Sequence, residues 1–189
     1  MQHIIYLHGF LSSPMSEKAR QTQAFFKKHY PSINLHAPRL PGNIDRAVDI
    51  IDSLVKTLPA NELRFIGSSM GGFLSNYFVE KYGGKAVLVN PAVEPFRLLV
   101  DYMGKHINPY SGEVFYITPE NISHLYGYYS EQVKKPDNYM VLLQTGDETL
   151  DYRTAAEKFR NSHLYIEQGG DHSFVDYHQW LPKIIAFLR

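Results

Sequence analysis

The sequence contains no cysteine among its 189 residues. Disulfide bridges, thiolate metal sites and cysteine nucleophiles are therefore excluded, and a reducing compartment is compatible with this composition. Net charge is absent as well, because 19 Lys and Arg residues balance 19 Asp and Glu residues. Such a chain has no overall positive field to attract a polyanion or an anionic membrane, so we expect neither nucleic acid nor a membrane as a partner.

Long apolar runs are missing too. No stretch is long enough to span a bilayer. The first residues carry only a strand-length apolar run and lack the basic region of a signal peptide, so we expect a cytoplasmic protein. With 44% hydrophobic and 20% charged residues, the chain has the composition of an ordinary globular protein, and its length suits one domain over residues 1–189.

What the sequence does contain is an alternation of short apolar segments with segments of helical periodicity. This alternation is typical of a parallel sheet covered by helices on both faces. Six strands are expected, several of them near-continuously apolar, at 4–7, 33–37, 63–66, 86–89, 139–143 and 163–166. Five helices are expected, at 16–29, 44–58, 70–82, 152–159 and 177–188. The pattern predicts an α/β protein with a mainly parallel sheet of about six strands.

A glycine-rich turn, Gly67-Ser68-Ser69-Met70-Gly71-Gly72, joins the third strand to the third helix. The pattern G-x-S-x-G between a strand and a helix is that of a nucleophile elbow, which exposes its serine on a strained turn. Gly67 and Gly71 would remove side chains that collide in such a turn. Ser69, the central residue of the pattern, is therefore the candidate nucleophile. Ser68 is the poorer candidate, because it is not the central residue. The alternative is a close-packed or phosphate-binding turn.

A serine hydroxyl needs a base, and histidine has a suitable pKa. In enzymes whose serine sits on a nucleophile elbow, the catalytic histidine lies in the loop after the last strand of the sheet. His172 fits that position, in Gly169-Gly170-Asp171-His172-Ser173-Phe174. His178 is expected on a helix surface, and His8, at the end of the first strand, is expected to shape the loop that follows it.

The carboxylate that orients the histidine should follow one of the two preceding strands. Asn90, after the fourth strand, carries no charge, so we look for the acid after the fifth strand. Asp147 is the best-placed candidate there. Glu148 and Asp151 remain open, because the sequence does not determine which carboxylate of this short loop turns toward His172.

Acyl transfer also needs hydrogen-bond donors for the developing oxyanion. One donor is usually the backbone N–H after the nucleophile, here Met70, and the other lies in a loop after an early strand. That loop begins His8-Gly9-Phe10-Leu11, and the Phe10 N–H is the candidate. Phe10, Leu11 and Met70 are also the candidate substrate-binding residues.

The strand-helix alternation breaks at 91–138, where aromatic residues and short helical fragments dominate. A connection of this length is usually functional, and we expect it to be a lid inserted after the fourth strand, beside the site. Aromatic side chains there either line an acyl pocket or pack a small cap. The candidates are Tyr102, Tyr110, Phe115, Tyr116, Tyr126, Tyr128 and Tyr129.

Three motifs together, at 7–10, 67–72 and 169–174, resemble the YqiA-like family of small bacterial α/β-hydrolases. The resemblance covers essentially the whole chain. It implies an α/β-hydrolase fold and a cytoplasmic esterase without a cofactor that acts on acyl esters, or on acyl-CoA thioesters. Carried over by position, it implies a triad of Ser69, Asp147 and His172.

The expected function is hydrolysis of small acyl esters through an acyl-enzyme intermediate. An acyl-CoA thioesterase would use the same residues, although no basic cluster is dedicated to a CoA phosphate. A non-catalytic binding protein with a hydrolase fold is the alternative of a different class. A metal hydrolase is not expected, because no two histidines have helix-face ligand spacing with a glutamate between them.

Overall fold

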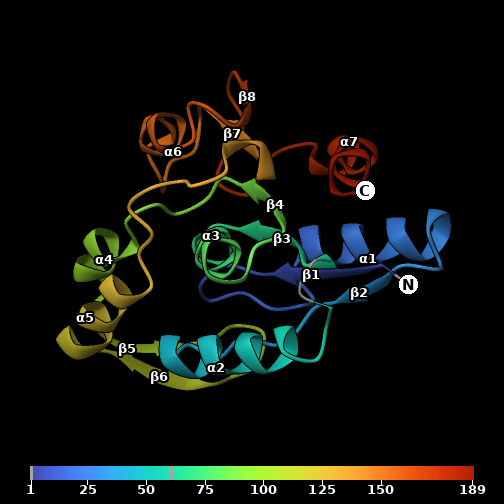
Figure 1. Ribbon diagram of the computed structural model, residues 1–189. Coiled ribbons are helices and arrows are strands. Elements are labelled where there is room, and N and C mark those ends of the chain that lie inside the picture. The colour runs from blue at the N-terminus through green and yellow to red at the C-terminus, as the bar shows by residue number, and fades with distance from the viewer. Residues whose placement is uncertain (1, 60–61) are drawn as a thin grey trace.

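The structure, a computed structural model, describes residues 2–59 and 62–189. Six parallel strands form its central sheet in the order β2-β1-β3-β4-β7-β8 (Figure 1). The predicted six-stranded parallel sheet is confirmed, and each strand lies within two residues of its expected bounds. The strands are β1 (His3–Leu7), β2 (Asn34–His36), β3 (Arg64–Ser68), β4 (Lys85–Val89), β7 (Tyr139–Gln144) and β8 (His163–Glu167).

All five expected helices are present, four of them shorter than expected by one to four residues. They are α1 (Glu17–His29), α2 (Ile44–Val55), α3 (Met70–Tyr82), α6 (Tyr152–Lys158) and α7 (Leu181–Leu188). The last one does not begin at Tyr177 as expected, because a 3-10 turn, η4 (Tyr177–Trp180), precedes it. Pro182 has no N–H to donate and fits only in the first turn of an α-helix. Within the described residues, no helix is both long and apolar enough to cross a membrane.

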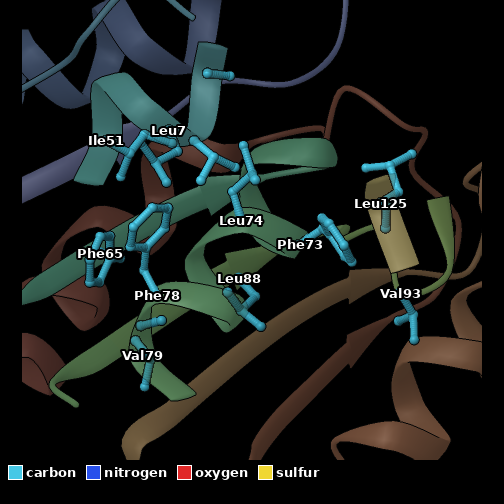
Figure 2. Packing of buried hydrophobic residues seen from close by; sticks show 14 of the residues in the cluster. Leu7, Ile51, Phe65, Phe73, Leu74, Phe78, Val79, Leu88, Val93 and Leu125 are labelled. Carbon is cyan, nitrogen blue, oxygen red and sulfur yellow. The ribbon is translucent and has the colours of Figure 1, made fainter. Parts of the chain in front are cut away.

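Each face of the sheet has its own apolar layer. Successive side chains of a strand point to opposite faces, so Ile5 and Leu7 of β1 pack toward α2 and α3, whereas Ile4 and Tyr6 pack toward α1 and α7. Figure 1 shows these helix pairs on opposite sides of the sheet. Figure 2 shows side chains of the first layer, where Leu74 of α3 meets Leu7.

The β4–β7 connection (residues 90–138) contains more regular structure than expected. Its β5 (Gly104–Ile107) and β6 (Val114–Ile117) form a separate antiparallel sheet (Figure 1), and Ile117 of β6 belongs to the same apolar cluster as Ala47 and Val48 of α2. These strands were not predicted from the sequence, because four residues are too few for a clear alternation and the outward side chains of β6 are themselves apolar. The connection's helices are α4 (Pro95–Leu98), η2 (Leu99–Tyr102), α5 (Pro119–Gly127) and η3 (Pro136–Asn138).

Candidate active site

Ser69 stands on the turn between β3 and α3 with an unusual backbone. Its φ of 55° and ψ of −120° lie where residues with a side chain are rarely found. Hydrogen bonds on both sides hold this conformation, because the Ser69 N–H donates to the carbonyl of Val89 and the Ser69 carbonyl accepts from the N–H groups of Gly72 and Ala92. The turn therefore has the strained, partly accessible serine of a nucleophile elbow.

The glycines on either side of Ser69 are required by close packing. A Cβ on Gly67 would collide with the carbonyl of Gly71, and a Cβ on Gly71 would collide with the carbonyl of Leu7. The expected clash at both positions is confirmed. The absence of these side chains lets the N-terminus of α3 pack directly against the end of β1.

His172 reaches Ser69 from the loop after β8. Its Nε2 lies 3.1 Å from the Oγ of Ser69, although the two residues are 103 positions apart. Gly169 and Gly170, with φ of 77° and 73°, turn this loop inward in a conformation that favours glycine. The structure thus brings together the serine and the histidine that the sequence singled out.

Asp147 lies behind His172. Its Oδ2 and Oδ1 lie 2.8 and 3.0 Å from the Nδ1 of His172, and its side chain is only 2% exposed. Oδ1 also accepts the N–H groups of Thr149 and Leu150. Burial raises the pKa of Asp147, but the hydrogen bonds from His172 and these two amides outweigh it and leave the pKa below its ordinary value.

The two other candidate carboxylates have different partners. Glu148 accepts the backbone N–H of His172 at 3.0 Å rather than contacting its ring. Asp151 accepts the N–H of Arg153 at the start of α6 and pairs with its guanidinium. Of the three carboxylates left open by the sequence, Asp147 is the one that reaches the imidazole.

The candidate oxyanion donors are backbone N–H groups without a partner among the described residues. Within the described chain, neither the N–H of Phe10 nor that of Met70 has a hydrogen-bond acceptor. The loop that carries Phe10 lies against the nucleophile, because a Cβ on Gly9 would be 3.2 Å from the Cβ of Ser69. Met70 is the first residue of α3, where the helix dipole favours a developing negative charge.

His8 fixes the shape of that loop, as expected. Its Nδ1 lies 2.9 Å from the carbonyl oxygen of Gly9, and its Nε2 accepts the N–H of Leu40 at 3.0 Å. Burial lowers the pKa of His8, an effect that the hydrogen bond to Gly9 opposes and the charge of Arg39 reinforces. The imidazole is therefore a neutral structural link.

Two hollows meet at Phe10, which lines both of them. A small apolar pocket of about 50 Å³ is lined by Phe10, Leu11 and Met70, the expected substrate-binding residues, together with Leu74 and Leu125. A larger, polar cleft of about 700 Å³ has Ser69, His172, Lys18 and Tyr110 among its lining residues.

The aromatic candidates of the β4–β7 connection divide between lining and packing. Tyr116 lines the apolar pocket and Tyr110 lines the polar cleft. The other five pack outside both linings: Tyr102 and Phe115 against Phe10, Tyr126 and Tyr129 against Phe96, and Tyr128 against Asp45. The alternative of simple packing therefore holds for most of them.

Two residues beneath the histidine have a role that was not predicted from the sequence. Asn90 directly follows β4 and Gln144 ends β7; each is 3% exposed and hydrogen-bonds to the loop that carries His172. The signal that points to them is a carboxamide at the end of an otherwise apolar strand, where a buried polar group requires partners.

Known structures share this architecture. A putative hydrolase from Agrobacterium vitis superposes with a TM-score of 0.72 at 17% identity, covering 100% of this chain and 88% of that chain. Est1E from Butyrivibrio proteoclasticus, solved with ferulic acid, superposes with a TM-score of 0.70 at 11% identity, covering 99% of this chain and 88% of that chain. Mouse α/β hydrolase domain-containing protein 10 superposes with a TM-score of 0.68 at 16% identity, covering 97% of this chain and 88% of that chain. The chain has the α/β-hydrolase fold, as predicted.

Sequence comparison assigns the family. A UPF0227 protein of Shewanella woodyi is 25% identical over 189 residues, which cover 98% of this chain and 99% of the relative. The family model of UPF0227, described as an uncharacterised protein family, matches residues 3–189. Since this match spans nearly the whole chain and confirms the YqiA-like resemblance, the protein belongs to the UPF0227 family.

Proposed function

We propose that this protein is a serine hydrolase that cleaves carboxylic esters through an acyl-enzyme intermediate. The observation that carries the proposal is the 3.1 Å contact between Ser69 Oγ and His172 Nε2, together with the contact between Nδ1 of the same imidazole and Asp147. This arrangement gives a hydroxyl a base and gives that base an orienting anion, which are the requirements for nucleophilic catalysis by serine.

In the first half-reaction, Ser69 Oγ attacks the acyl carbonyl carbon while its proton passes to Nε2 of His172. The carbonyl electrons move onto oxygen, which the unpaired N–H groups of Phe10 and Met70 stabilise. The bond to the leaving alkoxide then breaks, and His172 donates its proton to that oxygen. The acyl group remains on Ser69.

In the second half-reaction, water attacks the acyl carbon and His172 takes a proton from it. Collapse of the tetrahedral intermediate releases the carboxylic acid, and the proton returns from His172 to Ser69. Asp147 stays ionised throughout, since its lowered pKa keeps the carboxylate charged beside the imidazolium that forms in each half-reaction.

The two hollows suit different parts of the substrate. The apolar pocket suits the acyl chain, because it adjoins Phe10 and Met70, and the polar cleft at Ser69 and His172 suits the leaving group. The β4–β7 connection, including the lid segment 91–138, supplies the outer wall of the apolar pocket through Tyr116 and Leu125.

Hydrolysis of p-nitrophenyl acetate and butyrate by the purified full chain tests the proposal. Ser69→Ala and His172→Ala should each lower kcat by about a thousandfold or more, whereas Ser68→Ala and His178→Ala should retain activity. Loss of activity in Ser68→Ala instead of Ser69→Ala would reassign the nucleophile. If the wild-type chain hydrolysed no ester of a broad panel, a non-catalytic binding protein would replace the esterase.

The leaving group is tested separately. Rates on butyryl-CoA and on p-nitrophenyl butyrate compare a thioester and an ester of the same acyl group, with Ser69→Ala as the blank for both. We expect the ester to be the better substrate, because the polar cleft presents one lysine, Lys18, rather than a basic cluster. A higher kcat/KM on the thioester would make the protein a thioesterase.

A further inference from the structure

The loop that carries His172 (residues 168–176, hereafter the His172 loop) is built around two buried carboxamides. Asn90 and Gln144 come from neighbouring strands of the sheet, and neither is among the residues that line the apolar pocket or the polar cleft. Their side chains cannot contact a substrate in those hollows. They contact the peptide groups on both sides of His172.

Gln144 satisfies the backbone of the His172 loop at two places. Its Oε1 accepts the N–H of Asp171 at 3.2 Å and that of Val175 at 2.8 Å. Its Nε2 donates to the carbonyl of Val175 at 2.9 Å and to the carboxylate of Glu167 at 2.8 Å. A Cβ on Gly170 would collide with this carboxamide, so the loop folds directly over Gln144.

Asn90 holds the same loop from its other side. Its Nδ2 donates to the carbonyl of Asp171 at 3.0 Å and lies 3.5 Å from that of His172. Its Oδ1 accepts the backbone N–H of Gln144 at 3.0 Å. The two carboxamides thus form one continuous hydrogen-bond network from β4 and β7 to the residues around His172.

We propose that Asn90 and Gln144 are positioning residues that set the imidazole of His172 between Ser69 and Asp147. This role rests on the proposed function. Both are buried and fully paired, so their network is rigid. Two side chains from outside the loop also bond to its backbone, Lys18 to the carbonyl of Ser173 and Glu148 to the N–H of His172, but these hydrogen bonds are exposed to solvent. Rigidity matters because a misplacement of about 1 Å can cost roughly a hundredfold in rate.

Two variants remove the network with little other change. Asn90→Gly deletes the side chain and keeps the backbone, since Asn90 has a φ of 39°, which glycine adopts without strain. Gln144→Met keeps the side-chain length and deletes all four side-chain hydrogen bonds. Tyr139→Phe is the matched control, because it removes buried hydrogen bonds to Asn76 and Glu80 at the opposite end of β7.

Activity on p-nitrophenyl butyrate is the first readout. We expect kcat to fall about 10- to 100-fold in Asn90→Gly and Gln144→Met while KM stays within about twofold, since binding is kept and orientation is lost. Tyr139→Phe should keep kcat within about twofold of wild type, even if its thermal unfolding midpoint falls as far as those of Asn90→Gly and Gln144→Met. Equal loss of kcat in the control, or unchanged kcat in both variants, would overturn the positioning role.

Proton NMR of the His172 Nδ1–H, held against Asp147, is the second readout and needs no turnover. This proton should give a low-field resonance in wild type and in Tyr139→Phe, identified by its loss in His172→Ala, and should be lost or broadened in both variants. Were the wild type inactive but the resonance dependent on Asn90 and Gln144, the esterase proposal would fail and the positioning would stand. A resonance unchanged in both folded variants refutes the positioning.

Discussion

Oδ2 of Asp147 lies 2.8 Å from Nδ1 of His172, and this carboxylate is almost fully enclosed, with 2% of its side chain exposed. Two backbone N–H groups, those of Thr149 and Leu150, fix its orientation. A buried carboxylate held in this way can select the tautomer of the imidazole that leaves Nε2 free to accept the proton of Ser69.

Removing this carboxylate should stop the base from working while the fold persists. Asp147→Asn is expected to lower kcat by about 10³- to 10⁴-fold, because the amide favours the wrong tautomer of His172. Steady-state kinetics on a p-nitrophenyl ester measure the effect. The matched variant Asp151→Asn should cost no more than about 1 kcal/mol of stability, since it alters only the cap of α6 and an exposed ion pair with Arg153. A larger loss of kcat in Asp151→Asn would reassign the acid.

The apolar pocket should set the acyl length. Its volume is about 50 Å³, against about 700 Å³ for the polar cleft, so short acyl groups are expected to react fastest. Leu125→Ala should raise the rate on hexanoate relative to acetate esters, at a stability cost of about 2–5 kcal/mol. Ile122→Ala, on the same helix but outside the pocket lining, should leave that ratio unchanged; a parallel shift in both variants would argue against this pocket.

A glycine in the elbow should be far less replaceable than a glycine in the β4–β7 connection. Gly71→Ala places a methyl group against the carbonyl of Leu7 and is expected to destabilise the protein by about 1–3 kcal/mol. Gly127→Ala, at the end of α5, meets nothing within 4 Å and should be neutral or slightly stabilising. Urea unfolding of both variants checks this difference, and equal stabilities would contradict the packing described for the elbow.

An ionic contact joins the β4–β7 connection to α2 and should respond to pH. Nδ1 of His124 lies 2.6 Å from Asp45, and Tyr128 donates to the same carboxylate at 2.7 Å. The hydrogen bond and the charge of Asp45 raise the pKa of His124 above 6.5. Burial raises the pKa of Asp45, but its bonds to Tyr128 and His124 bring it below 3.8.

Because the pKa of His124 is raised in the folded protein, its stabilisation is complete below pH 6.5 and is lost as pH rises through the raised pKa. The contribution of Asp45 has the opposite sign: it is present above pH 3.8 and is lost as pH falls through the lowered pKa. NMR titration of His124 should give a midpoint above 6.5 that falls in Asp45→Asn and remains in Asp49→Asn. An identical midpoint in all three proteins would show that the contact does not persist in solution.

The features that the sequence predicted are those coded by neighbouring residues. The elbow around Ser69 follows from two glycines and one serine, and the strands follow from short apolar runs. The roles of Asn90 and Gln144 depend on contacts with residues 27 to 82 positions away, which no local pattern encodes. The choice among Asp147, Glu148 and Asp151 was open for the same reason, since all three share one short loop.

The β5–β6 hairpin escaped prediction for a different reason. Its outward side chains, Ile107, Val114 and Tyr116, are apolar but exposed, so hydrophobicity and burial do not coincide there. The register of the hairpin depends on packing against the rest of the protein, where Phe115 meets Phe10 edge-on with ring centroids 5.7 Å apart.

Covalent labelling of Ser69 tests the central claim most directly. A fluorophosphonate probe should add once to the wild-type chain in an intact-mass measurement, peptide mapping should place the adduct on Ser69, and the adduct should be absent from Ser69→Ala. His172→Ala should slow the labelling strongly, because no base then takes the serine proton. A wild-type chain that stays unlabelled, or an adduct that persists in Ser69→Ala, would contradict the assignment of Ser69 as an activated nucleophile.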